Sequence, residues 1–244
     1  MKELNLKISI AHLFPSSLNL YGDGANVLIL KKRCEWRGIE VELDEVDSCD
    51  NLTEHDIYFI GSGTDEQMEN ISVELFGKRD LLLSERDKGS VFLGVCGGYQ
   101  LLGKSFELSD GRCVQGVGLL DLNTVKGKKR FTGNVTAKVD FVEPNVLVGF
   151  ENHNDLTYLE GDTKPLMNLS IGNGNNSMDK TEGARYKNVF GTYLHGPVLA
   201  LNSHFADYLI ELALEKRYGR KIRLTQLNDD FEILSHNNLI EKTY

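Results

Sequence analysis

Apolar and polar positions follow a regular order along the first hundred residues. Short apolar runs bounded by turn residues predict strands at Lys7–Leu13, Ile39–Leu43, Asp56–Ile60 and Ser90–Gly94. The segments between them predict helices from about Gly24 to Arg37 and from about Asp65 to Lys88. Strands that alternate with helices in this way are typical of a parallel sheet with helices on both faces.

Past Gly103 the pattern changes to shorter and more closely spaced apolar runs. These runs predict strands at about 116–124, 135–141, 146–150 and 189–194, followed by a helix at about 201–218. No internal repeat, low-complexity tract or Pro/Ser-rich linker divides the chain. The sequence therefore predicts a single α/β domain over residues 1–244, with an open, mostly parallel sheet and additional short strands in the second half.

Composition excludes several classes of function. The 244 residues have a formal net charge of −9 and a pI near 5.2, whereas nucleic-acid-binding proteins usually present a basic face. No apolar run approaches the roughly 18 residues of a membrane-spanning helix, and the N-terminus lacks the pattern of a signal peptide. Four cysteines without a Cys-x-x-Cys pair fit neither a disulfide framework nor a zinc site. We expect a cytoplasmic protein with free thiols and no metal, which neither binds nucleic acid nor enters a membrane.

A cysteine between glycines follows the last of the four buried strands, in the stretch Gly94-Val-Cys-Gly-Gly98. A sharp turn from strand to helix is the context of a nucleophile elbow, in which glycines leave room around a strained nucleophile. The positive end of the helix dipole would favour the Cys96 thiolate, and the Gly97 N–H would face a developing oxyanion. The alternative is a buried packing cysteine, which we prefer for Cys34, Cys49 and Cys113 but not for Cys96.

A thiol nucleophile needs a base, and the chain has six histidines. Active sites of open parallel sheets lie beyond the carboxyl ends of the strands. His195 ends the apolar run 189–194, just before a Gly-Pro pair, and His153 ends a similar run. We therefore favour His195 as the base, with His153 as the second candidate. The other four histidines are expected to be surface or packing residues.

Two motifs resemble class I glutamine amidotransferases of the cobyric-acid-synthase type, which have a flavodoxin-like fold. They are Cys-Gly-Gly-Tyr-Gln at 96–100 and Gly-Thr-Tyr-Leu-His-Gly-Pro at 191–197. Four further motifs look like the GatD-type glutaminase subunit of lipid II isoglutaminyl synthase, namely Leu-Asn-Leu-Tyr-Gly-Asp at 18–23, Glu-Trp-Arg-Gly at 35–38, Gly-Phe-Glu-Asn-His at 149–153 and Gly-Asn-Gly-Asn-Asn at 172–176. The resemblance covers roughly residues 5–220.

The resemblance implies a glutaminase in which Cys96 attacks the side-chain amide of glutamine and forms a thioester, while His195 transfers the protons. By position, Gln100 and Arg130 match family residues that hold the glutamine. The second oxyanion donor is expected in the loop after the strand that ends at Ile60, and we choose Gly63. This loop departs from the family's usual triple glycine followed by Gln-Asp, because here it reads Gly-Ser-Gly-Thr-Asp at 61–65.

Two absences point to a partner protein. Most class I amidotransferases have a glutamate two residues after the histidine, where this chain has Pro197. The chain also has no Gly-x-x-x-x-Gly-Lys-Ser/Thr phosphate-binding loop. The resemblance therefore implies a heterodimer in which a Mur-ligase-like, MurT-type synthetase binds ATP and Mg²⁺, with no cofactor in this chain. We expect that synthetase to insert an acidic residue beside His195.

Three hypotheses about function remain open at this point. The first is a glutaminase that supplies ammonia for amidation of the D-glutamate α-carboxylate in the peptidoglycan stem peptide, as part of cell-wall synthesis. The second is a glutaminase for another acceptor, such as a corrinoid acid. The third is an inactive binding module on the same fold, which the altered 61–65 loop keeps open although Cys96 and His195 are both present.

Overall fold

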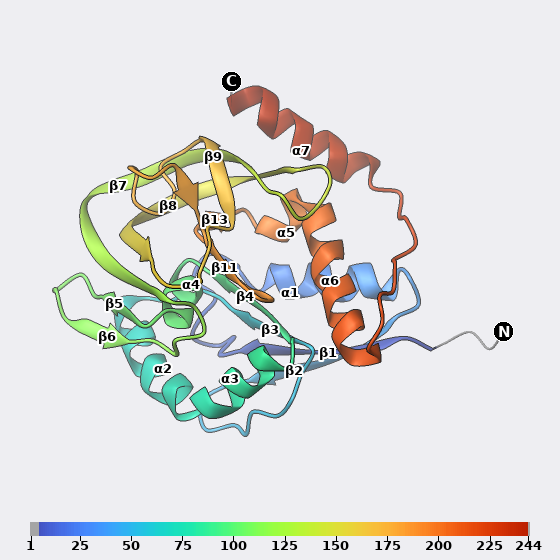
Figure 1. Cartoon of the computed structure of the whole chain (residues 1–244), viewed down its shortest axis with the longest axis horizontal. Helices are drawn as coiled ribbons and strands as arrows, with labels where there is room; N and C mark the ends of the chain where they lie inside the picture. Colours follow the sequence, from blue (N-terminus) through green and yellow to red (C-terminus); the bar gives the residue numbers. More distant parts are fainter. Residues whose placement is uncertain (1–4, 244) are drawn as a thin grey trace.

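A computed structural model describes residues 5–243 and contains two sheets (Figure 1). The first sheet has the strand order β11-β12-β4-β3-β1-β2. All of its pairings are parallel except that of β11 with β12. The bounds of its strands are β1 Lys7–Leu13, β2 Glu40–Val46, β3 Ile57–Ile60, β4 Val91–Val95, β11 Ala184–Tyr186 and β12 Val189–Thr192. The expected mostly parallel sheet is confirmed, and each of its four N-terminal strands lies within three residues of the predicted bounds.

Helices cover both faces of this sheet, as predicted. Helices α1 (Ala25–Glu35) and α6 (Ser203–Tyr218) pack together on one side, while α2 (Asp65–Gly77) and α3 (Arg79–Asp87) lie on the other (Figure 1). The single helix expected over 65–88 is wrong. It divides at Lys78, directly after Gly77, because the backbone of Lys78 leaves the helical region with φ −97° and ψ 4°.

The second sheet contains most of the strands whose bounds differ from the sequence-based prediction. Its path is β10-β9-β7-β5-β6, and β8 pairs with both β7 and β13. The bounds are β5 Ser105–Glu107, β6 Cys113–Gln115, β7 Leu122–Lys138, β8 Val146–Leu159, β9 Met167–Ile171, β10 Thr181–Glu182 and β13 Leu194–His195. The strand expected at 116–124 is wrong, because residues 116–121 form a loop, and the strand expected at 135–141 is the end of β7, which stops at Lys138.

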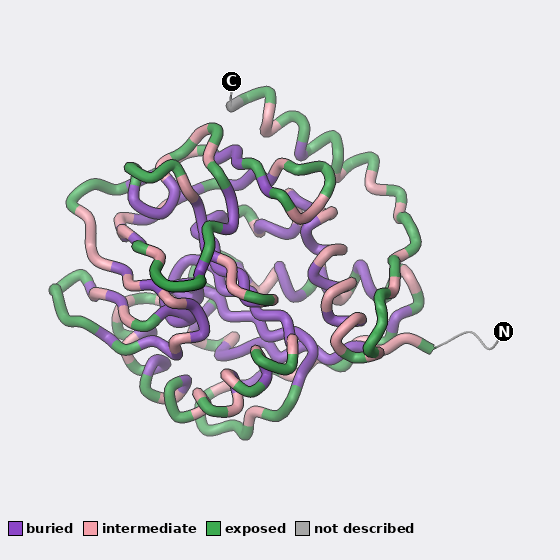
Figure 2. Tube along the Cα trace, viewed as in Figure 1, coloured by how far each residue is buried: buried purple, intermediate pink, exposed green. Residues whose placement is uncertain are grey.

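The C-terminal part contains α5 (Val198–Leu201) and α7 (Asp230–Thr243), neither of which the sequence pattern predicted. The buried Arg33 of α1 forms ion pairs with Asp207 of α6 at 2.6 Å and with Asp229 at 2.8 Å. The ion pair with Asp229 connects the segment before α7 to α1. A single buried core runs through the molecule (Figure 2).

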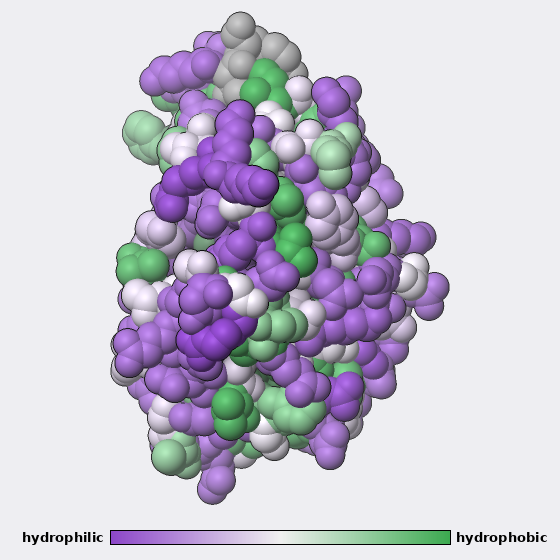
Figure 3. Space-filling model, turned by 90° about the vertical axis from the view of Figure 1, so that its left-hand side faces the viewer, coloured by the Kyte–Doolittle hydropathy of each residue, from purple (hydrophilic) through white to green (hydrophobic). Residues whose placement is uncertain are grey.

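The face shown in Figure 3 is largely hydrophilic, with small and separate apolar patches. Among residues 5–243, no helix is both long enough and apolar enough to cross a membrane.

Candidate active site

Cys96 occupies a strained turn between β4 and the short helix α4 (Gly97–Leu102). Its backbone has φ 52° and ψ −107°, a region that non-glycine residues rarely adopt. A Cβ atom on Gly98 would lie 2.1 Å from the carbonyl oxygen of Ile60, so only glycine fits there. The sharp turn from strand to helix predicted from the sequence is confirmed. Close packing of α4 against β3 explains Gly98, and close packing of α4 against β4 explains Gly94, where a Cβ atom would lie 2.7 Å from the Gly98 carbonyl oxygen.

His195 reaches the same place from the second sheet. The chain leaves β12 at Thr192 and pairs with β8 through β13, where His195 lies opposite Phe150. The imidazole is 8% exposed, and the ring of Tyr21 contacts it edge-on with ring centroids 4.7 Å apart. Cys96 and His195 therefore follow strands of different sheets that meet at this point.

A carboxylate of the chain itself faces His195. Asp23 is buried in the loop before α1, and its Oδ1 lies 3.5 Å from His195 Nδ1. This distance is within ion-pair range, although it is longer than a hydrogen bond. The conclusion that the chain lacks an acid beside His195 is wrong, because it considered only position 197. Asp23 lies in the loop from β1 to α1, and such a loop begins at the carboxyl edge of the parallel sheet, which could have suggested a role for its polar residues.

Two neighbouring side chains raise the pKa of His195. Burial by itself would lower the pKa of His195, but Asp23 and Cys96 raise it to about 9. The imidazole is therefore expected to be largely protonated at neutral pH. In this form it has a proton to give to a leaving amine.

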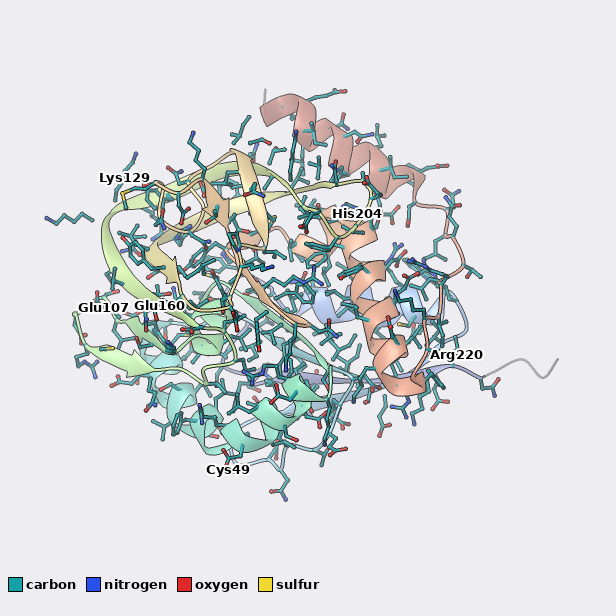
Figure 4. All side chains as sticks on the ribbon, viewed as in Figure 1. Cys49, Glu107, Lys129, Glu160, His204 and Arg220 are labelled. Carbon is teal, nitrogen blue, oxygen red and sulfur yellow. The ribbon has the colours of Figure 1, made fainter. Side chains whose placement is uncertain are left out.

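Cys96 opens into a cavity of about 220 Å³ that contains the other predicted site residues. Gly63, Gly97, Gln100 and Arg130 all line it. Glu107 of β5, labelled in Figure 4, is also in its wall. The structure thus brings five of the six predicted residues to one cavity, and the sixth, His195, adjoins it through Cys96.

The two predicted substrate-binding residues occupy different parts of the wall. Arg130 is exposed on an irregular part of β7, and its Nε donates to the Asn152 side-chain oxygen at 2.8 Å. Gln100 is 5% exposed, and its Nε2 lies 3.4 Å from the Tyr193 hydroxyl. Arg130 can therefore bind an anionic group at the mouth, while Gln100 is fixed deeper in the wall.

The predicted oxyanion donor Gly97 already has an acceptor within the chain. Its N–H donates to the Ser62 hydroxyl at 3.2 Å, and the Ser62 N–H donates to Asp23 Oδ2 at 3.0 Å. Ser62 is the second residue of the altered 61–65 loop, and no role was predicted for it from the sequence. An oxyanion that used the Gly97 N–H would have to displace the Ser62 hydroxyl.

We expect Ser62→Ala to raise kcat/KM for glutamine hydrolysis about threefold to tenfold. The variant frees the Gly97 N–H, and a neutral hydrogen bond contributes about 1 kcal/mol. Steady-state ammonia release by the variant and the parent protein measures the effect, with Ser72→Ala on α2 as the control for a buried hydroxyl outside the site. A decrease would show instead that the Ser62 hydroxyl itself donates to the oxyanion.

A larger hollow lies elsewhere. A groove of about 770 Å³ runs between the β7–β8 turn, α6 and the segment before α7, beside His204 (Figure 4). It contains neither Cys96 nor His195. Within residues 5–243, no group of three or more His, Cys, Asp or Glu side chains is arranged to hold a metal ion.

Comparison with known proteins agrees with the chemistry of this cavity. Residues 9–203 match the model of the CobB/CobQ-like glutamine amidotransferase domain. The chain belongs to this family.

Two relatives of this glutamine amidotransferase match it over most of its length, and both are subunit GatD of a glutamine-hydrolysing lipid II isoglutaminyl synthase. The protein of Staphylococcus aureus is 37% identical over 97% of this chain and 96% of its own length. The protein of Streptococcus pneumoniae is 38% identical over 91% of this chain and 86% of its own length.

More distant matches belong to longer or structurally known proteins. A probable cobyric acid synthase of Methanococcus maripaludis is 34% identical over 63% of this amidotransferase but only 31% of its own length. A crystal structure of a glutamine amidotransferase from Thermotoga maritima has a TM-score of 0.54 at 17% identity, covering 99% of each chain. At that identity the structural likeness supports the fold alone.

Proposed function

We propose that this chain is a glutaminase subunit that hydrolyses glutamine through a Cys96 thioester. The observation that carries the proposal is the convergence of Cys96 at a strained elbow and the buried His195, whose pKa is raised to about 9 by Asp23 and Cys96 against the effect of burial. Membership in a glutamine amidotransferase family indicates that the substrate is glutamine.

The steps follow from the positions of these groups. The Cys96 sulfur attacks the side-chain amide carbon of glutamine, and backbone N–H groups of Gly63 and Gly97 stabilise the oxyanion. The His195 imidazolium gives its proton to the leaving nitrogen, so ammonia departs and a thioester remains. His195, now neutral, takes a proton from water as the water attacks the thioester. Glutamate leaves and the thiolate is restored. Arg130 would hold the substrate α-carboxylate at the cavity mouth.

We further propose that the ammonia passes to a Mur-ligase-like, MurT-type synthetase that amidates the D-glutamate α-carboxylate of the lipid II stem peptide. The extended similarity to two GatD subunits supports this acceptor. The ATP and Mg²⁺ sites would be on that partner, and the two chains would form a heterodimer. A cytoplasmic location fits, because the nucleophile must remain a reduced thiol. Amidation of a corrinoid acid is the second candidate, which the shorter match to cobyric acid synthases favours.

A glutamine-mimicking chloroketone tests the chemistry directly. We expect it to label Cys96 alone at one equivalent near neutral pH and to abolish ammonia release. The internal control is provided by Cys49 and Cys113, which are exposed free thiols; Cys49 lies at the edge of the molecule (Figure 4). Undiminished labelling of Cys96→Ala, or equal labelling of the exposed thiols, would contradict the proposal. The protein that co-purifies with this chain distinguishes the two acceptors.

A further inference from the structure

His153 is the second histidine at the cavity, and its ring is held in a fixed orientation. It lies on β8, is 3% exposed, and lines the same cavity as Cys96 and Arg130. The ring stacks on Tyr193 with centroids 3.9 Å apart and an interplanar angle of 9°. The ring of Phe131 contacts the imidazole edge-on, with ring centroids 5.5 Å apart. The two aromatic contacts fix the plane of the imidazole and therefore the directions of its two nitrogens.

The contacts of the ring also determine its tautomer. His153 Nδ1 lies 3.1 Å from the backbone carbonyl oxygen of Asp155, which can only accept. The proton must therefore be on Nδ1. Burial lowers the pKa of His153 to about 4, so the ring is neutral at pH 7. His153 Nε2 consequently has a free lone pair, and this buried nitrogen has no hydrogen-bond partner among the described residues.

A buried acceptor without a partner is costly unless a ligand supplies a donor. The cavity wall around it has both signs of charge, with carboxylates of Asp65, Glu107 and Asp155 as well as the Arg130 guanidinium. A zwitterion fits such a wall better than an anion. Glutamine is a zwitterion, and its side-chain amide must reach Cys96, which leaves its α-ammonium to be bound near the α-carboxylate.

In the proposed function, the Arg130 guanidinium binds that α-carboxylate. Its guanidinium donates to Asn152, the residue directly before His153 on β8. The α-ammonium and α-carboxylate share one carbon atom, so the ammonium must lie within a few ångströms of the group that Arg130 binds. We propose that His153 Nε2 accepts a hydrogen bond from the α-ammonium of glutamine and thereby makes the cavity selective for an α-amino acid. This inference rests on the proposed glutaminase function.

Two substrates separate this role from a structural one. Glutaramate is glutamine without its α-amino group, and it retains both the amide and the carboxylate. We expect His153→Phe, which keeps an aromatic ring against Tyr193 but removes the acceptor, to lower kcat/KM for glutamine about tenfold, mainly through KM. A hydrogen bond to a charged group is worth about that factor. The variant should leave kcat/KM for glutaramate within twofold of the parent value.

Matched variants complete the experiment, which uses the chain together with its co-purified partner. His153→Gln, whose amide oxygen can accept, should recover part of the lost glutamine activity, whereas Arg130→Ala should weaken both substrates because both have the carboxylate. Equal losses for the two substrates in His153→Phe, or an unchanged KM for glutamine, would overturn the inference.

A measurement without turnover separates failure of this inference from failure of the proposed function. Calorimetric binding to Cys96→Ala should show that adding His153→Phe weakens glutamine about tenfold and does not change glutaramate. A parent protein that binds glutamine selectively but releases no ammonia would contradict the glutaminase proposal and leave the proposed role of His153 standing. A parent protein that binds neither compound would sink both.

Discussion

We expect replacement of His195 by alanine to slow glutamine hydrolysis about 100-fold or more. Loss of a general acid and base typically costs 10²- to 10⁴-fold, and here it would also remove the protonated imidazole beside Cys96. The change should appear in kcat as well as in kcat/KM, because His195 acts on the reacting atoms. Ammonia release under steady-state conditions measures both constants.

His153→Ala is the natural comparison for this variant, because both histidines are buried near the same cavity. It should cost far less than His195→Ala and act mainly on KM, as expected for a group that binds rather than transfers a proton. If His153→Ala proved the more damaging change to kcat, the catalytic base would have to be reassigned to β8.

Replacement of Asp23 by asparagine should reduce kcat about 10- to 100-fold and lower the pKa of His195 from about 9 toward its ordinary value of 6.5. The variant preserves the size of the side chain and an oxygen for the Ser62 N–H, but it removes the charge that faces the imidazole. A carboxylate in this position fixes the tautomer of a histidine and stabilises its charged form. Imidazole titration by NMR follows the pKa, and ammonia release follows the rate.

The same variant decides between an internal and an external acid. If Asp23 orients His195, the isolated chain should hydrolyse glutamine without its partner. A normal rate and an unchanged His195 titration in Asp23→Asn would contradict this role. The partner's interface carboxylates would then be changed to amides one at a time, since an acid inserted by the synthetase would be the remaining source.

Local patterns predicted the first half of the fold and the turn at Cys96 well, for a physical reason. Strands of the parallel sheet are buried on both faces, so they appear as continuous apolar runs such as Val91–Val95. The elbow at Cys96 requires glycines at fixed neighbouring positions, because a side chain at Gly98 would collide with the backbone of Ile60 and one at Gly94 with the backbone of Gly98. Such requirements are contained within a few residues of sequence.

The second sheet and the groups around His195 could not be predicted in this way. Strand β7 runs through Gly127 and a series of lysines with low strand propensity, and it is held by pairing with β8 rather than by its own residues. Asp23 and Ser62 lie 172 and 133 positions before His195, so only the folded chain shows that they share one network. The functional meaning of His153 depends on its tautomer, which is set by a carbonyl oxygen rather than by a sequence pattern.

The separation of Cys96 and His195 between two sheets has a consequence for refolding. The position of Cys96 depends on the parallel sheet and α4, whereas that of His195 depends on the pairing of β13 with β8. Under the proposed function, recovery of ammonia release therefore requires both sheets to be in place, whereas recovery of helical content does not.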